Sequence, residues 1–200
     1  MGRWAPDARG RLLAAAFDLF SERGFEDVTV EEIAQRAGLT ERTFFRYFSD
    51  KREVLFWGAQ MLQDLLVKGV DNAPGQLAPL ATVEFALLQA AGEFFDGSQE
   101  FAKRRQAIIA SNPELQEREL IKLASLSSAL AQALARRHVS DPTATLAAEL
   151  GIVVFKTAFV EWVNDSCGKS LSQLIHDDMA QLDGITRVPS ARERARHASP

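Results

Sequence analysis

Two arginines in one short segment carry the most informative chemistry of the sequence. Arg42 and Arg46 lie four residues apart, and Phe44 and Phe48 are offset from them by two residues. Residues four apart share one face of a helix, so this segment would present cations on one side and aromatic rings on the other. A guanidinium group can donate two parallel hydrogen bonds to a guanine edge or to a phosphate. The spacing therefore predicts a helix that packs through its phenylalanines and offers its arginines to nucleic acid.

Helix start and stop signals surround this segment. Thr29 and Glu32 have the spacing of a capping box, which begins a helix, and Gly38 ends that helix. Thr40 then caps the short helix that carries the arginines, so only three residues separate the two helices. In two helices joined in this way, the first can support the second, and the second can enter a major groove of DNA. We therefore expect a helix-turn-helix.

The rest of the chain shows helical periodicity and almost no alternation of strand type. The sequence predicts an all-α fold of about nine helices, over residues 6–23, 29–37, 40–47, 50–70, 80–94, 98–110, 114–137, 142–165 and 170–182. We expect an N-terminal three-helix domain over 1–52, a larger helical domain over 53–185 and a disordered tail over 186–200, which is rich in Pro, Ser, Arg and Ala.

The charge of the chain is uneven. Its net charge of −4 argues at first against a nucleic-acid partner. Residues 1–52, however, contain nine basic and nine acidic residues, so all the excess negative charge lies in the remainder. A segment without net charge binds DNA only if its basic groups share one face. The arrangement of those groups in space therefore decides the question.

Few residues offer other chemistry. Cys167 is the single cysteine, which excludes an internal disulfide and a cysteine-built metal cluster. His138, His176 and His197 lie far apart, each without a histidine or cysteine three or four residues away, so we expect no metal site. The sequence has no glycine-rich phosphate loop and no nucleophile motif. We therefore expect neither an enzyme nor a resident cofactor.

The composition is that of a soluble globular protein, with 46% hydrophobic residues in 200. The N-terminal segment lacks the apolar core of a signal peptide, and no apolar run approaches the roughly 18–20 residues that cross a bilayer. We expect a cytoplasmic protein that does not enter a membrane.

The stretch TVEEIAQRAGLTERTFFRYFSDKREVL, residues 29–55, resembles the DNA-binding signature of the TetR family of repressors. The matching positions are Gly24, Phe25, 29–34, 37–40, 43–48, Lys51 and Leu55. The resemblance implies a repressor that binds double-stranded operator DNA as a homodimer, because one helix-turn-helix touches too few base pairs for useful specificity.

The resemblance also assigns roles to residues. Four would contact phosphates: Thr29, Thr40, Tyr47 and Lys51. Three would face base edges, with Arg46 the best candidate for guanine: Arg42, Thr43 and Arg46. Phe45 departs from the family, which most often has tyrosine there, and leaves an apolar contact to a sugar or a thymine methyl group. The alternative for the arginines is that they lie on a solvent-exposed helix face and contact no DNA.

The C-terminal part resembles the actinobacterial subgroup that includes mycofactocin-type regulators. The similar stretches are RWAPDARGRL near the N-terminus, residues 104–124 and FKTAFVEWV at 155–163. The resemblance implies a small-molecule effector, an acyl-coenzyme A. Its phosphates would then meet arginines (Arg104, Arg105 or Arg118) and its acyl chain would lie among phenylalanines (Phe85, Phe94, Phe155 and Phe159). The alternative is that these arginines are surface ion-pair partners and the phenylalanines are core.

Two structural questions stay open at this point. The helix that carries Trp162 is apolar on several sides and belongs either to the core or to a subunit interface. Because the last two helices of this family usually form the dimer contact, we assign Trp162, Leu171, Leu174 and Ile175 to dimerisation. The other classes of function are a constitutive DNA-binding dimer with a filled core, and a small-molecule carrier with a vestigial helix-turn-helix.

Overall fold

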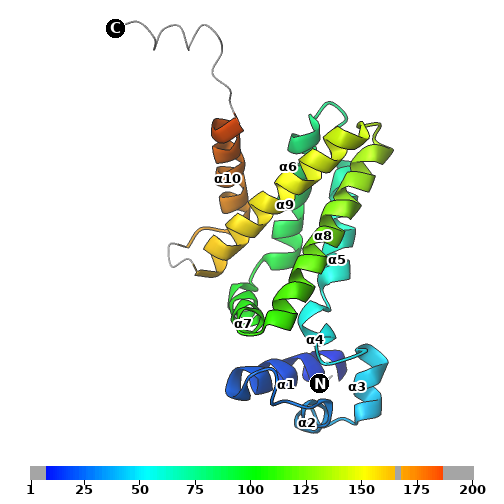
Figure 1. Ribbon diagram of the computed structural model, residues 1–200, viewed down its shortest axis with the longest axis vertical. Helices are drawn as coiled ribbons and strands as arrows, with labels where there is room; N and C mark the ends of the chain where they lie inside the picture. Colours follow the sequence, from blue (N-terminus) through cyan, green and yellow to red (C-terminus); the bar gives the residue numbers. More distant parts are fainter. Residues whose placement is uncertain (1–7, 165–167, 187–200) are drawn as a thin grey trace, which may run out of the picture.

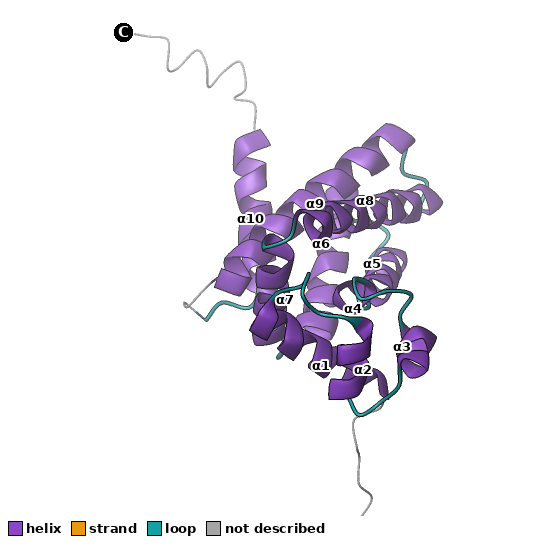
Figure 2. Ribbon diagram, turned by 60° about the horizontal axis from the view of Figure 1, so that its bottom comes forward, coloured by secondary structure: helices purple, strands orange, loops and turns teal. Residues whose placement is uncertain are grey.

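The computed structural model describes residues 8–164 and 168–186. Within these ranges the chain forms ten α-helices and one π-helical segment, and no strand, so the all-α prediction is confirmed (Figures 1 and 2). The helices are α1 (Ala8–Arg23), α2 (Val30–Arg36), α3 (Glu41–Tyr47), α4 (Glu53–Phe56), α5 (Ala59–Asn72), α6 (Pro79–Ala90), α7 (Gln99–Ala110), α8 (Pro113–Arg136), α9 (Asp141–Asn164) and α10 (Leu171–Thr186). The π-helical segment, η1, covers Ala91–Phe95. The predicted helix start at residue 6, Cys167 and residues 187–200 of the predicted tail lie outside the described residues.

The first three helices form a compact head at one end of the molecule (Figure 1). Its core holds Phe17, Phe20, Ile33, Phe44 and Phe48, all at most 4% exposed. The same core continues through Val54–Phe56 and also takes in residues of α7 and α8. The head is therefore packed directly on the larger helical part, which we call the sensor.

The turn between α2 and α3 is stabilised by backbone hydrogen bonds. The Leu39 amide donates to the Ala34 carbonyl at 2.8 Å, and the Gly38 amide donates to the Gln35 carbonyl at 3.0 Å. This pattern is a Schellman motif, which requires a left-handed residue, and Gly38 has φ +64°. The capping box is also confirmed, because the Glu32 amide donates to Thr29 Oγ1 and the Thr29 amide donates to the Glu32 carboxylate. The helix-turn-helix is thus fixed by local interactions.

One predicted helix is divided in two. The sequence predicted a single helix over residues 50–70, whereas the structure has α4 and α5 separated at Trp57–Gly58. A Cβ atom at Gly58 would lie 2.7 Å from Cζ of Phe94, so the phenyl ring packs on bare backbone at the break. This contact joins the start of α5 to η1. In η1 the hydrogen bonds span five residues, as in a π-helix, instead of four as in an α-helix.

The sensor core is formed by α5, α6, α8, α9 and α10. By length and composition α9 could cross a membrane, with a mean hydropathy of 1.5. The prediction that no apolar run reaches this length is therefore wrong. Ten residues of α9 are buried, where the helix packs against α6, α8 and α10, whereas Leu146, Val153 and Val160 are exposed. Apolar side chains on both the buried and the exposed side give it the composition of a membrane span.

The head also touches the sensor away from α4. The rings of Phe17 on α1 and Phe101 on α7 lie 4.3 Å apart, centroid to centroid. Beside them, Arg104 of α7 donates to Asp18 of α1 at 2.9 Å. The α1–α7 contact therefore supplies a second attachment between the two parts.

Candidate functional site

The outer face of α3 presents the predicted arginines to solvent. Arg42 and Arg46 are exposed, whereas Phe44 is fully buried and Phe48 nearly so. Phe45 is 53% exposed on the same outer face, an unusual position for an aromatic ring. The structure therefore separates a cationic face from a buried aromatic face, as the spacing predicted.

Tyr47 connects two of the cations. Arg46 donates to the Tyr47 hydroxyl at 3.0 Å, and its guanidinium lies 4.9 Å from the centre of the Tyr47 ring. Arg9 of α1 lies over the same ring at 5.5 Å. These contacts keep both guanidinium groups near the outer end of α3.

Ion pairs elsewhere on the head explain how a segment without net charge acquires a positive face. Three of its arginines are paired with carboxylates away from the outer face of α3: Arg23 with Glu32, Arg36 with Glu22, and Arg52 with Asp50. Arg9, Arg42 and Arg46 have no ion pair with any residue of 8–164 or 168–186. The unpaired arginines thus lie on or beside α3, whose first turn also carries one exposed carboxylate, Glu41.

The hydroxyls of the two capping threonines take part in their helices. Thr29 Oγ1 accepts from the Glu32 amide at 3.2 Å and donates to the Glu32 carboxylate at 3.0 Å. Hydrogen bonds from Arg23 and then from Thr29 lower the pKa of Glu32 to about 2. Thr40 Oγ1 accepts from the Thr43 amide and lies 3.1 Å from the Thr43 hydroxyl. DNA contact by these threonines stays a prediction.

Lys51 has a different environment from the one that the resemblance implied. Its ammonium donates to the carbonyls of Phe25, Glu26 and Val28 at 2.8, 3.1 and 3.0 Å. An ammonium group has three donors, so these bonds use all of them. This side chain therefore holds the loop between α1 and α2. A phosphate contact by Lys51 stays a prediction.

A cavity of about 710 Å³ lies in the sensor, between α4–α5, η1, α7, α8 and α9. Three of the four predicted phenylalanines line it: Phe94, Phe155 and Phe159. Phe95 lies against both Phe155 and Phe159, at 5.9 and 5.7 Å between ring centres. Phe85 is not among the lining residues. We call this space the apolar cavity.

Only one of the three predicted arginines reaches the apolar cavity. Arg105 lines it, and the same side chain donates to the Leu55 carbonyl of α4 at 2.7 Å and to Glu119 at 2.8 Å. Arg104 bonds to α1, and Arg118 forms an ion pair with Glu53 of α4. Arg104 and Arg118 therefore bond to α1 and α4 and do not line the apolar cavity, and their contact with a ligand stays a prediction.

Several lining residues were missed by sequence reasoning. They are aromatic, apolar or polar side chains of the cavity wall: Trp57, Met61, Phe101, Glu119, Leu123 and Lys122. One signal was available for Phe101, because it lies four residues before Arg105 and so shares its helix face. No group of His, Cys, Asp and Glu positioned to hold a metal ion occurs in the part of the chain that the structure describes.

The residues assigned to dimerisation are buried within one protomer. Trp162, Leu171, Leu174 and Ile175 are at most 5% exposed, because they pack α10 and the end of α9 on the sensor core. Their assignment to dimerisation stays a prediction. The same two helices expose other apolar side chains: Leu146, Val153 and Val160 on α9, and Ile185 on α10.

An all-helical chain with a helix-turn-helix head and a hollow helical sensor has the architecture of a one-component transcriptional regulator. Residues 12–56 match the family described as bacterial regulatory proteins, tetR family, and residues 77–186 match the MftR C-terminal domain. This chain belongs to the tetR family of bacterial transcriptional regulators.

A protein of Mycobacterium tuberculosis whose name assigns it to transcriptional regulation of mycofactocin biosynthesis, MftR, is 33% identical over 161 residues. The match covers 75% of this chain and 77% of that protein. The resemblance to mycofactocin-type regulators is thereby confirmed.

Solved structures share the fold at lower identity. NalD of Pseudomonas aeruginosa, a repressor of a multidrug efflux pump, has a TM-score of 0.61 and 19% identity, covering 89% of this chain and 96% of that chain. FadR of Thermus thermophilus, in complex with lauroyl-CoA, has a TM-score of 0.53 and 22% identity, covering 96% and 98%. These likenesses concern the fold alone.

Proposed function

We propose that this regulator is a repressor that binds a palindromic operator as a homodimer and is released by a hydrophobic effector such as an acyl-CoA. The observation that carries the proposal is the outer face of α3, where Arg42, Phe45 and Arg46 are exposed together above a fully buried Phe44. A helix that packs through its buried aromatic face and exposes its arginines on the opposite face is suited to enter a major groove. The repressor acts in the cytoplasm, where its operator is.

The exposed face of α9 supports a two-fold dimer. Leu146, Val153 and Val160 recur every seven residues, are at least 50% exposed and lie on one side of the helix. A monomer rarely leaves such a stripe in water, and a two-fold axis beside α9 and α10 would bury it against its own copy. Two heads would then address two half-sites of an inverted repeat.

The apolar cavity supports an effector rather than a constitutive dimer. Its volume of about 710 Å³ lies within the range of small-molecule sites, and the constitutive alternative requires a filled core. An acyl chain suits the phenyl rings of Phe94, Phe155 and Phe159. The fold relative from Thermus thermophilus is found with lauroyl-CoA, which makes that thioester the first compound to try.

Arg105 could couple effector binding in the apolar cavity to the position of the head. Its guanidinium lies at the cavity wall, donates to the Leu55 carbonyl and stacks 5.1 Å from the Phe56 ring, so it touches cavity and α4 together. An anionic group that attracts Arg105 competes with the Leu55 carbonyl for the same donors. Effector binding and DNA binding would then be coupled, and the coupling must be reciprocal.

Operator binding tests the first half of the proposal. A DNA fragment covering the protein's own promoter region is titrated in fluorescence anisotropy, with Arg46→Ala as the variant and Arg36→Ala as the matched control. Loss of a bidentate base contact costs about 1–3 kcal/mol, so Arg46→Ala should bind roughly 5- to 150-fold more weakly. Arg36, paired with Glu22, should be neutral. Equal affinities for all three proteins would remove α3 as the reading helix.

Effector response tests the second half. Lauroyl-CoA is added to the preformed DNA complex of the original protein and of Arg105→Gln. We expect release from the original protein and a dissociation midpoint at least several-fold higher for the variant, because Arg105 links cavity and α4. Tight binding of lauroyl-CoA without any operator binding would instead identify a carrier.

A further inference from the structure

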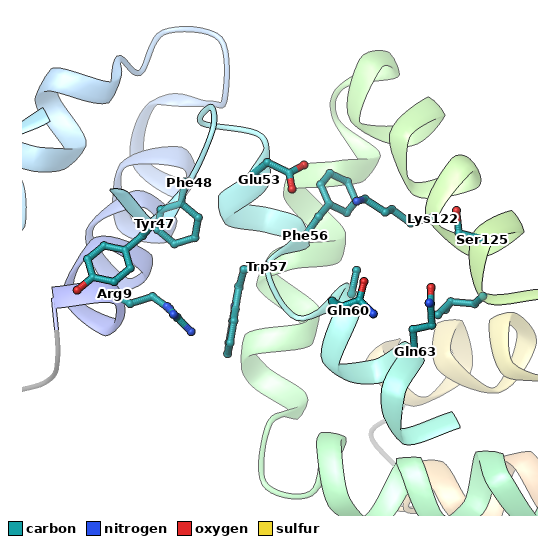
Figure 3. A pocket seen from close by; sticks show the side chains of 12 residues that line it. Arg9, Tyr47, Phe48, Glu53, Phe56, Trp57, Gln60, Gln63, Lys122 and Ser125 are labelled. Atoms are coloured by element: carbon teal, nitrogen blue, oxygen red, sulfur yellow. The ribbon is translucent and has the colours of Figure 1, made fainter. Parts of the chain in front are cut away.

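A second cavity, of about 500 Å³, lies between the head and the sensor (Figure 3). Arg9 and Tyr47 reach it from the head, and Trp57, Gln60 and Lys122 reach it from α4–α5 and α8. We call it the junction cavity. It is separate from the apolar cavity, although Trp57 and Lys122 contribute to the walls of both.

The junction cavity has an excess of positive charge. Arg9 and Lys122 form no ion pair with a carboxylate in residues 8–164 or 168–186. The one carboxylate of the lining, Glu53, is held by Arg118, whose Nε donates to it at 2.9 Å. In the apolar cavity, by contrast, Arg105 is already paired with Glu119. Lys122 and Lys156 also line the apolar cavity, so the junction cavity differs from it through Arg9, and its two unpaired cations favour an anion.

Aromatic rings form another part of its wall, beside polar and aliphatic side chains. Tyr47, Phe48, Phe56 and Trp57 all line it, and Trp57 is only partly buried. In Figure 3 the Trp57 ring stands between the Arg9 side and the Gln60 side of the space. Partly buried rings stack well on another planar ring, and nearby amide groups can bond to its polar edge. These features favour a planar molecule.

We propose that the junction cavity is a second ligand site, for a small planar aromatic anion. The charge would lie at Arg9 or at Lys122, which Figure 3 shows on opposite sides of the Trp57 ring, and the planar ring would lie against Trp57. A volume of about 500 Å³ admits either an aromatic carboxylate or a nucleoside monophosphate, which share this chemistry. The inference does not depend on what the apolar cavity binds.

Such a ligand would regulate DNA binding directly. Because it touches the head and the sensor at once, its affinity depends on how the two are arranged. Arg9, one of its cations, shares the Tyr47 ring with Arg46 of the reading helix. Occupancy of the junction cavity therefore stabilises the arrangement that brings Arg9, Tyr47 and Lys122 together, and operator affinity changes with it.

The test uses the full chain and two probes, 1-naphthoate and adenosine 5′-monophosphate, in calorimetric titrations. The variants are Arg9→Gln and Lys122→Gln, with Lys103→Gln, on the exposed face of α7, as the matched control. Loss of one charge-assisted hydrogen bond weakens binding by roughly tenfold or more. We expect that loss in the variant whose cation meets the charge of the probe, and none in the control. The probe that binds more tightly identifies carboxylate or phosphate as the source of the anion.

Two further measurements keep the result specific. Phe159→Ala alters only the apolar cavity and should leave probe affinity unchanged. A saturating probe should shift operator affinity of the original protein. The proposal is overturned if neither probe binds, if Arg9→Gln and Lys122→Gln bind as the original protein does, if Phe159→Ala abolishes binding, or if operator affinity does not move.

Discussion

At the scale of single residues, Lys51 shows how a side chain that looks suited to phosphate binding can have a structural task. Its three donors are used by carbonyls of the loop between α1 and α2, and its ammonium lies 4.4 Å from the Phe25 ring centre. Those carbonyls lie 23 to 26 residues earlier in the chain. No local sequence pattern could have identified them, because the partners meet only in the folded head.

Replacing this lysine should therefore reduce stability rather than DNA contact alone. Lys51→Met removes the donors from two partly buried carbonyls and one exposed carbonyl, at a cost of about 1–3 kcal/mol. Urea unfolding without DNA should show a lower midpoint, whereas Lys103→Met, exposed on α7, should not. A midpoint equal to that of the original protein would contradict this structural role of Lys51.

Glu32 makes the stability of the head depend on pH. Hydrogen bonds from Arg23 and Thr29 lower its pKa from 4.5 to about 2 in the folded protein. A lowered folded pKa stabilises the fold above the unfolded pKa, and this contribution is lost as the pH falls toward 2.

Unfolding by urea between about pH 3 and pH 6 measures this contribution. The midpoint of the original protein should fall more steeply with acid than that of Glu32→Gln, which keeps an acceptor but has no charge to titrate. Glu31→Gln, an exposed neighbour, serves as the control. Parallel pH profiles for the original protein and Glu32→Gln would contradict the assignment.

At the scale of elements, the break between α4 and α5 joins the end of the head to the wall of the apolar cavity. Phe94 packs on Gly58 with no room for a Cβ atom, and the same ring lines the cavity. Gly58→Ala should displace the ring, because the new Cβ atom would lie only 2.7 Å from Cζ of Phe94. Because the end of a side chain can yield, we expect the fold to survive and lauroyl-CoA affinity to fall several-fold.

Titration calorimetry with lauroyl-CoA checks this, with Gly92→Ala as the control because a Cβ atom there meets nothing within 4 Å. The double variant Gly58→Ala/Phe94→Leu should recover affinity by freeing the space. If Gly58→Ala binds lauroyl-CoA like the original protein, the ring does not set the cavity size.

The elements also show which parts of the structure the sequence could predict. The capping box at Thr29, the turn at Gly38 and the cap at Thr40 use partners within five residues, so sequence patterns located α2 and α3. The break at Gly58 depends on Phe94, far along the chain, and so was missed. On α9, both faces are apolar, and sequence alone could not decide which one the protomer buries.

At the scale of the whole molecule, the exposed stripe of α9 predicts the oligomer. Val153→Glu places a charge in the middle of the stripe, and a buried unpaired charge opposes association. Light scattering after size-exclusion chromatography should show a dimer for the original protein and a monomer for this variant. Gln76→Glu, in the loop before α6, adds the same charge and should leave the dimer intact. A monomer in the original protein would refute the two-fold assembly.

The α1–α7 contact also restricts how the head can move. Phe17 with Phe101, and Arg104 with Asp18, bind the head at one place, and Arg105 and Arg118 bind α4 at another. Asn112 also bonds to Glu26 of the head, and Ile108, Ile109 and Leu115 share its buried core, so any displacement of the head must disturb at least one of these contacts. In a symmetric pair of subunits, the distance between the two reading helices would then change only together with these contacts. A ligand at either cavity would act by changing which of them are kept, which allows chemically unrelated signals to produce the same output.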